Sequence, residues 1–284
     1  MEGRRIFKFD ELTWQEIKRL DKNRTIVFLS ISPLEAHGPH LPVGTDVYGA
    51  WDIAEKAACI VAGENTHLTS ILLPALPVGC CGVTSDFHGT ITLGGATLLN
   101  LVLDIAHSLS SQGFLFLVIS NHHLDPVHMK ALLTAIDKIE SQCPLKILES
   151  GSRIVYSGIH MDLQNRIAGA GLAFEKEVHA DVKETAFIMH RHPHLLKGIY
   201  AGLPPVHIDV GAGFRKGLKT FKQMGATQGY IGSPAKAGPE LGRAYLEESA
   251  ALLAQLALKL YNGDPLPEMQ DDIKYILKHY VRLD

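Results

Sequence analysis

The sequence contains little cysteine and tryptophan, and it has no long apolar run. Among its 284 residues there are four cysteines and two tryptophans. The cysteines show no spacing typical of a metal-binding or disulfide framework, so we expect reduced thiols. No apolar stretch reaches the ~18 residues that a membrane-spanning helix requires. The charged N-terminal stretch lacks the apolar centre of a signal peptide, and we therefore expect a cytoplasmic protein without a membrane partner.

An excess of positive charge is also absent. The 27 lysines and arginines are outnumbered by 30 aspartates and glutamates, which gives a net charge of −3 with neutral histidines. Nucleic-acid-binding domains usually carry a basic face, so we expect no nucleic-acid partner. The chain is 46% hydrophobic and 20% charged, which is typical of globular proteins and excludes a disordered chain or a coiled coil. Because repeats and linkers are lacking, we predict one domain over residues 1–284.

Short apolar runs alternate with helical patterns along the chain. We expect strands over residues 26–31, 71–76, 114–119 and 146–148, and helices over residues 47–62, 97–112, 127–141 and 239–260. This alternation predicts an α/β fold with a mostly parallel sheet and helices on both faces. No glycine-rich dinucleotide-binding motif follows a predicted strand, which argues against a nicotinamide-dependent oxidoreductase.

Histidine is abundant, with 15 residues, and several histidines stand beside acidic residues. Three groups contain them: Glu35, His37, His40 and Asp46 after the first predicted strand; Asn121, His122, His123 and Asp125 after the third; and His179, Asp181 and Glu184 further on. Open α/β sheets bind ligands at the carboxyl ends of their strands. Imidazole nitrogens and carboxylate oxygens are ligands for zinc, manganese or iron(II).

The first group lies in a loop rich in proline and glycine, residues 32–46, and favours a metal site. Glu35 and His37 are two residues apart, and in an extended loop alternate side chains point the same way. The prolines and glycines before Asp46 can fold the loop back towards them. A loop of solvated polar residues explains this spacing equally well, but the second group at another strand end favours the metal site. We interpret the following as surface or hydrogen-bonded histidines rather than ligands: His40, His88, His107 and His122.

The same loop resembles the signature of the creatininase, or creatinine amidohydrolase, family. Residues 35–46 (EAHGPHLPVGTD) match the pattern E-x-H-G-P-H-L-P-x-G-T-D at every fixed position. Further similar segments follow in the same order: 87–91 (FHGTI), 179–185 (HADVKET) and 229–234 (GYIGSP). The resemblance spans roughly residues 26–260. It implies a three-layer α/β/α fold, a small-molecule substrate and a homo-oligomer, commonly a hexamer.

The resemblance also implies a hydrolase with two divalent metal ions per chain, which would be zinc, manganese or iron. One ion would bind Glu35, Asp46 and His123, and the other would bind His37, Asp46 and Glu184. Asp46 would then bridge the ions, with a water or hydroxide between them. Metal binding lowers the pKa of water to about 7, which makes a hydroxide nucleophile available at neutral pH. A metal can also polarise a substrate carbonyl.

Further residues acquire roles through the same resemblance. His179 corresponds to the family's candidate for the acid that protonates the leaving nitrogen, and the pKa of histidine suits this task. Asp125 stands where creatininase has a catalytic glutamate, and we expect it to orient the water. His88 and Asn121 are candidate substrate contacts, although ordinary loop polarity explains His88 equally well.

Because the sequence departs from the family pattern at several positions, the resemblance does not identify the substrate. The second family signature contains N-G-H, and here His122 replaces the glycine. Trp14 and Trp51 lie outside residues 151–177. In creatininase, the corresponding segment carries tryptophans that close over the bound substrate. We therefore predict a metal-dependent hydrolase of an amide or cyclic amide, with formamide, peptide or cyclic sugar-derivative hydrolysis as alternatives. A non-catalytic scaffold for binding or assembly is a further alternative.

Overall fold

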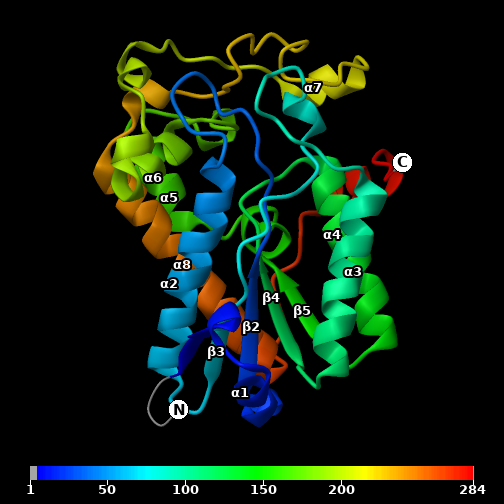
Figure 1. The fold of residues 1–284 in the computed structure, drawn as a ribbon. Helices are drawn as coiled ribbons and strands as arrows, with labels where there is room; N and C mark the ends of the chain where they lie inside the picture. The colour runs from blue at the N-terminus through cyan, green and yellow to red at the C-terminus, as the bar shows by residue number, and fades with distance from the viewer. Residues whose placement is uncertain (1–4, 284) are drawn as a thin grey trace.

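A five-stranded parallel sheet forms the centre of the protein (Figure 1), in a computed structural model that describes residues 5–283. The strands follow the order β1-β3-β2-β4-β5. Their bounds are β1 (Ile6–Lys8), β2 (Thr25–Ser30), β3 (Thr69–Leu72), β4 (Phe116–Ser120) and β5 (Lys146–Glu149). Each neighbouring pair is parallel, which confirms the predicted sheet type.

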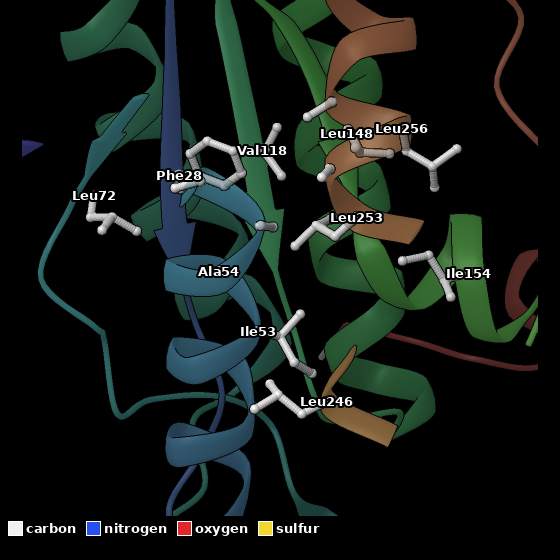
Figure 2. Close-up of a cluster of buried hydrophobic side chains, with 14 of the residues drawn as sticks. Phe28, Ile53, Ala54, Leu72, Val118, Leu148, Ile154, Leu246, Leu253 and Leu256 are labelled. Carbon is white, nitrogen blue, oxygen red and sulfur yellow. The ribbon is translucent and has the colours of Figure 1, made fainter. Parts of the chain in front are cut away.

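Helices cover both faces of this sheet (Figure 1). On one face lie α2 (Thr45–Glu64), α6 (Val182–Arg191) and α8 (Pro239–Asn262), and on the other lie α3 (Gly95–Ser111) and α4 (Pro126–Gln142). Successive side chains of a strand point to opposite faces, and β2 shows the consequence. Phe28 packs into the cluster under α2 and α8 (Figure 2), whereas Val27 and Leu29 pack into the cluster under α3 and α4. Burial on both faces explains why residues 26–29 of β2 are all apolar, and the helices on both faces confirm the three-layer α/β/α fold.

Several elements differ from the sequence prediction. The short edge strand β1 was not predicted, because three residues carry too weak a pattern. Residues 71–76 form a strand only as far as Leu72, since Pro74 has no N–H group to donate to the ladder. The backbone still runs beside β2, because the amides of Leu73 and Leu76 donate to β2 carbonyls at 2.9 Å.

The remaining helices lie outside the two main layers. They are α1 (Trp14–Arg19), α5 (Met161–Gly169), α7 (Val210–Arg215) and α9 (Asp271–His279). A π-helical turn, Gly151–Val155, precedes α5. Within residues 5–283, none of the helices has the length and apolar character needed to cross a membrane.

The crossing of α6 and α8 depends on Gly242, and we expect Gly242→Ala to lower the free energy of unfolding by about 3 kcal/mol. A Cβ atom at position 242 would lie 1.9 Å from the carbonyl oxygen of Ala186, so the helices would have to separate. Overpacking of this kind costs roughly 1–3 kcal/mol or more. Chemical denaturation of the variant measures the loss.

Gly63→Ala in α2 is the matched control for this prediction. A Cβ atom at position 63 would meet nothing within 4 Å, and alanine is the better helix former by about 1 kcal/mol. We therefore expect the control to be as stable as the wild type or slightly more stable. Equal stability of both variants would show that the helix crossing tolerates a side chain.

Candidate metal centre

The carboxyl ends of β2 and β4 place the candidate ligands side by side. Ser30 and Ser120, the last residues of these strands, are register partners. Glu35 and His37 follow β2, and His123 follows β4. Asp46 lies in the first turn of α2, and Glu184 lies in the first turn of α6. Gly38 lets the intervening loop turn, since its φ of +64° is in the left-handed region that favours glycine.

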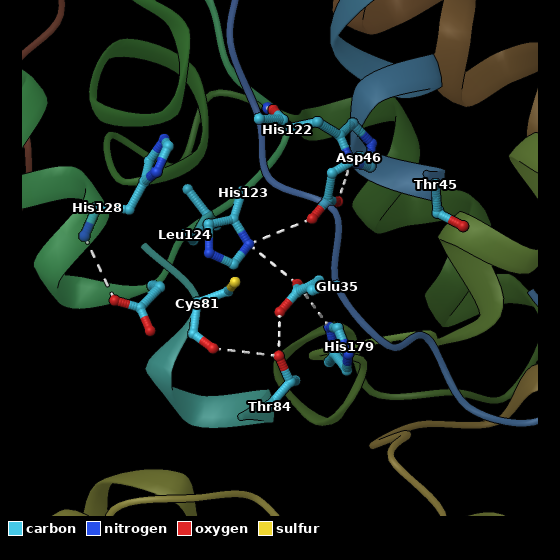
Figure 3. A network of polar contacts seen from close by, with 12 residues as sticks. Glu35, Thr45, Asp46, Cys81, Thr84, His122, His123, Leu124, His128 and His179 are labelled. Carbon is cyan, nitrogen blue, oxygen red and sulfur yellow. Dashed lines mark hydrogen bonds and ion pairs between the residues drawn. The ribbon is translucent and has the colours of Figure 1, made fainter. Parts of the chain in front are cut away.

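These side chains form two adjacent groups that share Asp46. In the first group, His123 Nδ1 lies 3.0 Å from Glu35 Oε1 and 3.2 Å from Asp46 Oδ2 (Figure 3). In the second group, His37 Nε2 lies 3.4 Å from Asp46 Oδ1 and 3.8 Å from Glu184 Oε2. Within each group, the candidate ligand atoms all lie within 4.8 Å of one another. The structure therefore brings together all five residues that the sequence nominated as metal ligands.

Hydrogen bonds fix which imidazole nitrogen of each histidine faces the site. A carbonyl oxygen only accepts, so His37 donates from Nδ1 to the carbonyl of Glu35 at 3.0 Å, and Nε2 is the nitrogen that faces the site. His123 likewise donates from Nε2 to the carbonyl of Cys80 at 2.8 Å, so its Nδ1 faces the site. Such partners orient metal-binding histidines. His37 Nε2 and Asp46 Oδ2 are buried without a hydrogen bond from any described residue, and a divalent cation in each group would give both atoms a partner.

The long loop between β3 and α3 supports the first group. It supplies the Cys80 carbonyl, and the hydroxyl of Thr84 donates to Glu35 Oε2 at 2.6 Å (Figure 3). This bond leaves Glu35 Oε1 facing His123. The sequence analysis singled out residues 87–91 and His88 in this loop, and Thr84 was not predicted to contribute.

The electrostatics of the site favour a bound cation. Burial by itself would lower the pKa of His37, but the carboxylates of Asp46, Glu184 and Glu35 raise it to about 10. Burial would raise the pKa of Asp46, yet His37 and the neighbouring imidazoles keep it well below its usual value. Protonated imidazole thus compensates buried carboxylates here. A metal ion would replace these protons, because its ligands bind in the deprotonated form.

His179 reaches the same site from the segment before α6. Its Nε2 donates to the Ala36 carbonyl at 2.9 Å, and its Nδ1 lies 3.6 Å from Glu35 Oε1. The ring contacts His37 in a tilted arrangement, with centroids 4.4 Å apart and an interplanar angle of 43°. Glu35, His37 and His179 form a further group with metal-ligand geometry. This position suits the predicted acid and also suits a ligand.

Ala180 occupies a strained conformation next to His179. Its φ is +46°, a region that residues other than glycine rarely adopt, and such strain is concentrated at functional sites. The Ala180 amide donates to Glu184 Oε2 at 2.6 Å. The strained backbone therefore orients a candidate ligand.

Three further residues that the sequence nominated, Asp125, Asn121 and His88, lie outside the two ligand groups. Asp125 caps α4, since its Oδ1 accepts from the amides of Val127 and His128 at 2.8 and 3.3 Å. Asn121 donates to the His123 carbonyl at 2.7 Å, and it lines the cavity described below. His88 is exposed. Neither His88 nor Asp125 lies in the wall of that cavity, so their catalytic and substrate-binding roles stay predictions.

His40 is a hydrogen-bonded histidine, as interpreted from the sequence. Its Nε2 lies 2.8 Å from Thr185 Oγ1, and the side chain is buried. Burial and the charge of His37 lower its pKa from 6.5 to about 4. The folded pKa lies below the unfolded value, so stability is complete above pH 6.5 and is lost as the pH falls towards 4.

We therefore expect His40→Gln to reduce the loss of stability in mild acid. For the wild type, protonation of the unfolded chain at this position should cost about 2 kcal/mol between pH 7.5 and pH 5. Glutamine does not titrate, and its side-chain amide can replace Nε2 in the bond to Thr185. Urea denaturation at the two pH values measures the difference. An unchanged difference would show that His40 does not control this pH dependence.

His122 and Tyr245 belong to the site although the sequence analysis did not place them there. The His122 side chain is only 4% exposed, and its Nδ1 lies 3.0 Å from Asp46 Oδ1. Its Nε2 lies 2.7 Å from the Tyr245 hydroxyl. His122 was interpreted as a surface or hydrogen-bonded histidine, and the second interpretation is correct. Tyr245 gave no local signal, because it lies on α8, far along the chain.

A cavity of about 500 Å³ opens onto these groups. Glu35, Asp46, His179 and Glu184 line one part of it. An apolar wall that includes Ile154, Leu163 and Phe174 lines another. Its size and mixed lining suit a small molecule. A larger depression of about 780 Å³ beside β1 and α2 has none of the candidate ligands in its wall.

The fold and the site define a class of α/β proteins with a potential metal centre at the carboxyl edge of a parallel sheet. The creatininase family profile, described as creatinine amidohydrolase, matches residues 10–257. The chain belongs to the creatininase family, which confirms the resemblance seen in the sequence.

Individual relatives support this assignment over part of the chain. Creatinine amidohydrolase from Pseudomonas putida is 31% identical over 121 residues, which cover 40% of this chain and 44% of that protein. A mycofactocin precursor peptide peptidase from Mycobacterium ulcerans (strain Agy99) is 29% identical over 107 residues, or 37% of this chain and 43% of that protein. The chain thus spans less than half the length of these relatives. A solved structure described as "Creatininase Mn" has the same fold, with a TM-score of 0.68, 21% identity and coverage of 88% and 96% of the two chains.

Proposed function

We propose that this protein is a hydrolase with two divalent metal ions that cleaves a C–N bond in an amide or cyclic amide. The observation that carries the proposal is the position of the Asp46 carboxylate. One of its oxygens faces His37 and the other faces His123, at 3.4 and 3.2 Å. A carboxylate placed between two ligand groups is suited to bridge two ions. Zinc, manganese or iron would fit these nitrogen and oxygen ligands.

Each residue of the site would have a distinct role in hydrolysis. Glu35, Asp46 and His123 would hold one ion, and His37, Asp46 and Glu184 the other. When bound, the ions supply a water of lowered pKa and a positive charge for the substrate carbonyl oxygen. His179 Nδ1 would donate a proton to the leaving nitrogen, since its Nε2 is already engaged by Ala36. The apolar wall would exclude bulk water from the reacting groups.

A peptide amide is the second candidate substrate. Similarity to the mycofactocin precursor peptide peptidase favours it, and Leu163 and Phe174 in the cavity wall offer apolar contacts for a side chain. The assembly into a hexamer and the cytoplasmic location stay predictions.

A hydrolysis screen with metal-loaded protein tests the proposal. The screen should contain creatinine, formamides, small lactams, short peptides and cyclic keto-sugars, each with zinc-, manganese- and iron-loaded protein. Protein treated with a chelator is the control. We expect two ions per chain and turnover of at least one amide that the chelated protein does not hydrolyse. Fewer than two ions after loading, without any hydrolysis, would favour the non-catalytic scaffold.

A further inference from the structure

The ring of His122 lies between a candidate bridging carboxylate and a buried tyrosine. Its two nitrogens are 3.0 Å from Asp46 Oδ1 and 2.7 Å from the Tyr245 hydroxyl. Both nitrogens therefore have partners. His37 differs, since its Nε2 is buried near the same carboxylate without a hydrogen bond from any described residue.

The ring of His122 is surrounded by residues of α2, α6 and α8. A Cβ atom at position 49 would lie 2.5 Å from His122 Cδ2, so only glycine leaves room for the ring against α2. Gly49 follows Asp46 by three residues, about one helical turn. Phe187 of α6 lies 6.0 Å from the ring, between centroids, and Tyr245 of α8 lies 5.6 Å from it. Three helices thus define the position of one side chain.

The two hydrogen bonds determine the tautomer of His122. An ionised carboxylate only accepts hydrogen bonds, so Nδ1 carries the hydrogen that is donated to Asp46. A neutral ring then has a lone pair on Nε2, and the Tyr245 hydroxyl donates to it. The order of donation is Tyr245 to His122 to Asp46. A ligand nitrogen would need a lone pair facing the site, and His122 presents a hydrogen there.

We propose that His122, supported by Tyr245, is a positioning residue that fixes the orientation of the Asp46 carboxylate between the two ligand groups. A hydrogen bond to Oδ1 hinders rotation of the carboxylate, so that Oδ2 continues to face His123. The inference rests on the proposed function, because it concerns how Asp46 binds cations. It assigns His122 outside the ligand set, and its position is one at which the family pattern has glycine.

Zinc affinity measured by competition with a chromophoric chelator tests this role. We expect His122→Phe to weaken zinc binding roughly 10–100-fold, the usual effect of losing a group that orients a ligand. His122→Asn is the conservative variant, because the asparagine amide can donate from a position close to Nδ1. It should retain affinity near that of the wild type. Equal losses in both variants, or no loss in either, would overturn the positioning role.

A double-mutant cycle tests the same role. Its first variant changes Gly49 and leaves the hydrogen-bonding residues His122 and Tyr245 unchanged. We expect Gly49→Ala to weaken zinc binding, because the added methyl group displaces the His122 ring. In a His122→Ala background, Gly49→Ala should have no further effect, since there is no ring to displace. Additive effects of the two substitutions would show that Gly49 does not act through His122.

The tautomer of His122 in the metal-free protein separates this inference from the proposed function. Nitrogen-15 NMR should show hydrogen on Nδ1 in the wild type and a mixture of tautomers in Tyr245→Phe. Hydrogen on Nε2 in the wild type would overturn the inference. A wild-type protein that binds no zinc but shows the Nδ1–H tautomer would overturn the proposed function and leave the hydrogen-bonded arrangement established.

Discussion

Asp46→Asn is expected to remove both metal ions and to abolish hydrolysis. Asp46 is the only residue common to the two proposed ligand sets, and an amide lacks the negative charge that a bridging ligand contributes. Loss of both ions would remove the whole metal-dependent acceleration, which for enzymes is typically about 10⁶-fold or more over the uncatalysed reaction. Metal analysis of the purified variant after reloading and a turnover assay measure the two effects.

Asp52→Asn provides the control for this experiment. Asp52 is also a buried carboxylate of α2, but it pairs with Arg191 at 2.8 Å and not with a candidate ligand. We expect the control to lose some stability and to retain both ions. Retention of both ions and normal turnover in Asp46→Asn would contradict the bridging role.

His179→Ala is expected to slow turnover by roughly 10²–10⁴-fold, the usual scale of general acid–base assistance, while the metal content stays at two ions per chain. The Nδ1 atom of His179 lies at the edge of the site, 3.6 Å from Glu35 Oε1. Turnover and metal content are measured on the same samples.

His107→Ala is the control, because His107 is exposed on α3, across the sheet from α2 and α6. It should behave as the wild type. If His179→Ala loses an ion, then His179 is a ligand of the group that it forms with Glu35 and His37, and another residue must protonate the leaving nitrogen.

The sheet was predictable because its strands are buried on both faces. Residues 26–31 and 114–119 are short, mainly apolar runs that contain β-branched and aromatic residues, and they indicated β2 and β4 within two residues of their ends. The candidate ligands Glu35, His37 and Asp46 were visible because they lie within one short stretch of sequence, residues 35–46, that carries a family signature. The end of β3 was misplaced, since the apolar pattern continues through a proline that the ladder cannot include.

The features of the site that the sequence could not show depend on contacts between segments that are far apart in the chain. Tyr245 is a tyrosine in an amphipathic helix, and nothing near it in the chain indicates that its hydroxyl meets His122. The catalytic role of Asp125 was predicted from the family's glutamate at the corresponding position. The structure adds that Asp125 is the N-cap of α4, a contact that the family pattern did not indicate.

The five candidate ligands come from four separate segments, which lie between residues 35 and 184 of the chain. Such a set does not exist in the unfolded polypeptide, whose donors are too far apart to surround one ion. In the proposed metal enzyme, cation uptake and folding would therefore be linked equilibria, and each tenfold excess of free ion over its dissociation constant would add about 1.4 kcal/mol to native-state stability. The supply of metal in the surroundings would then affect the thermal tolerance of the protein as well as its chemistry.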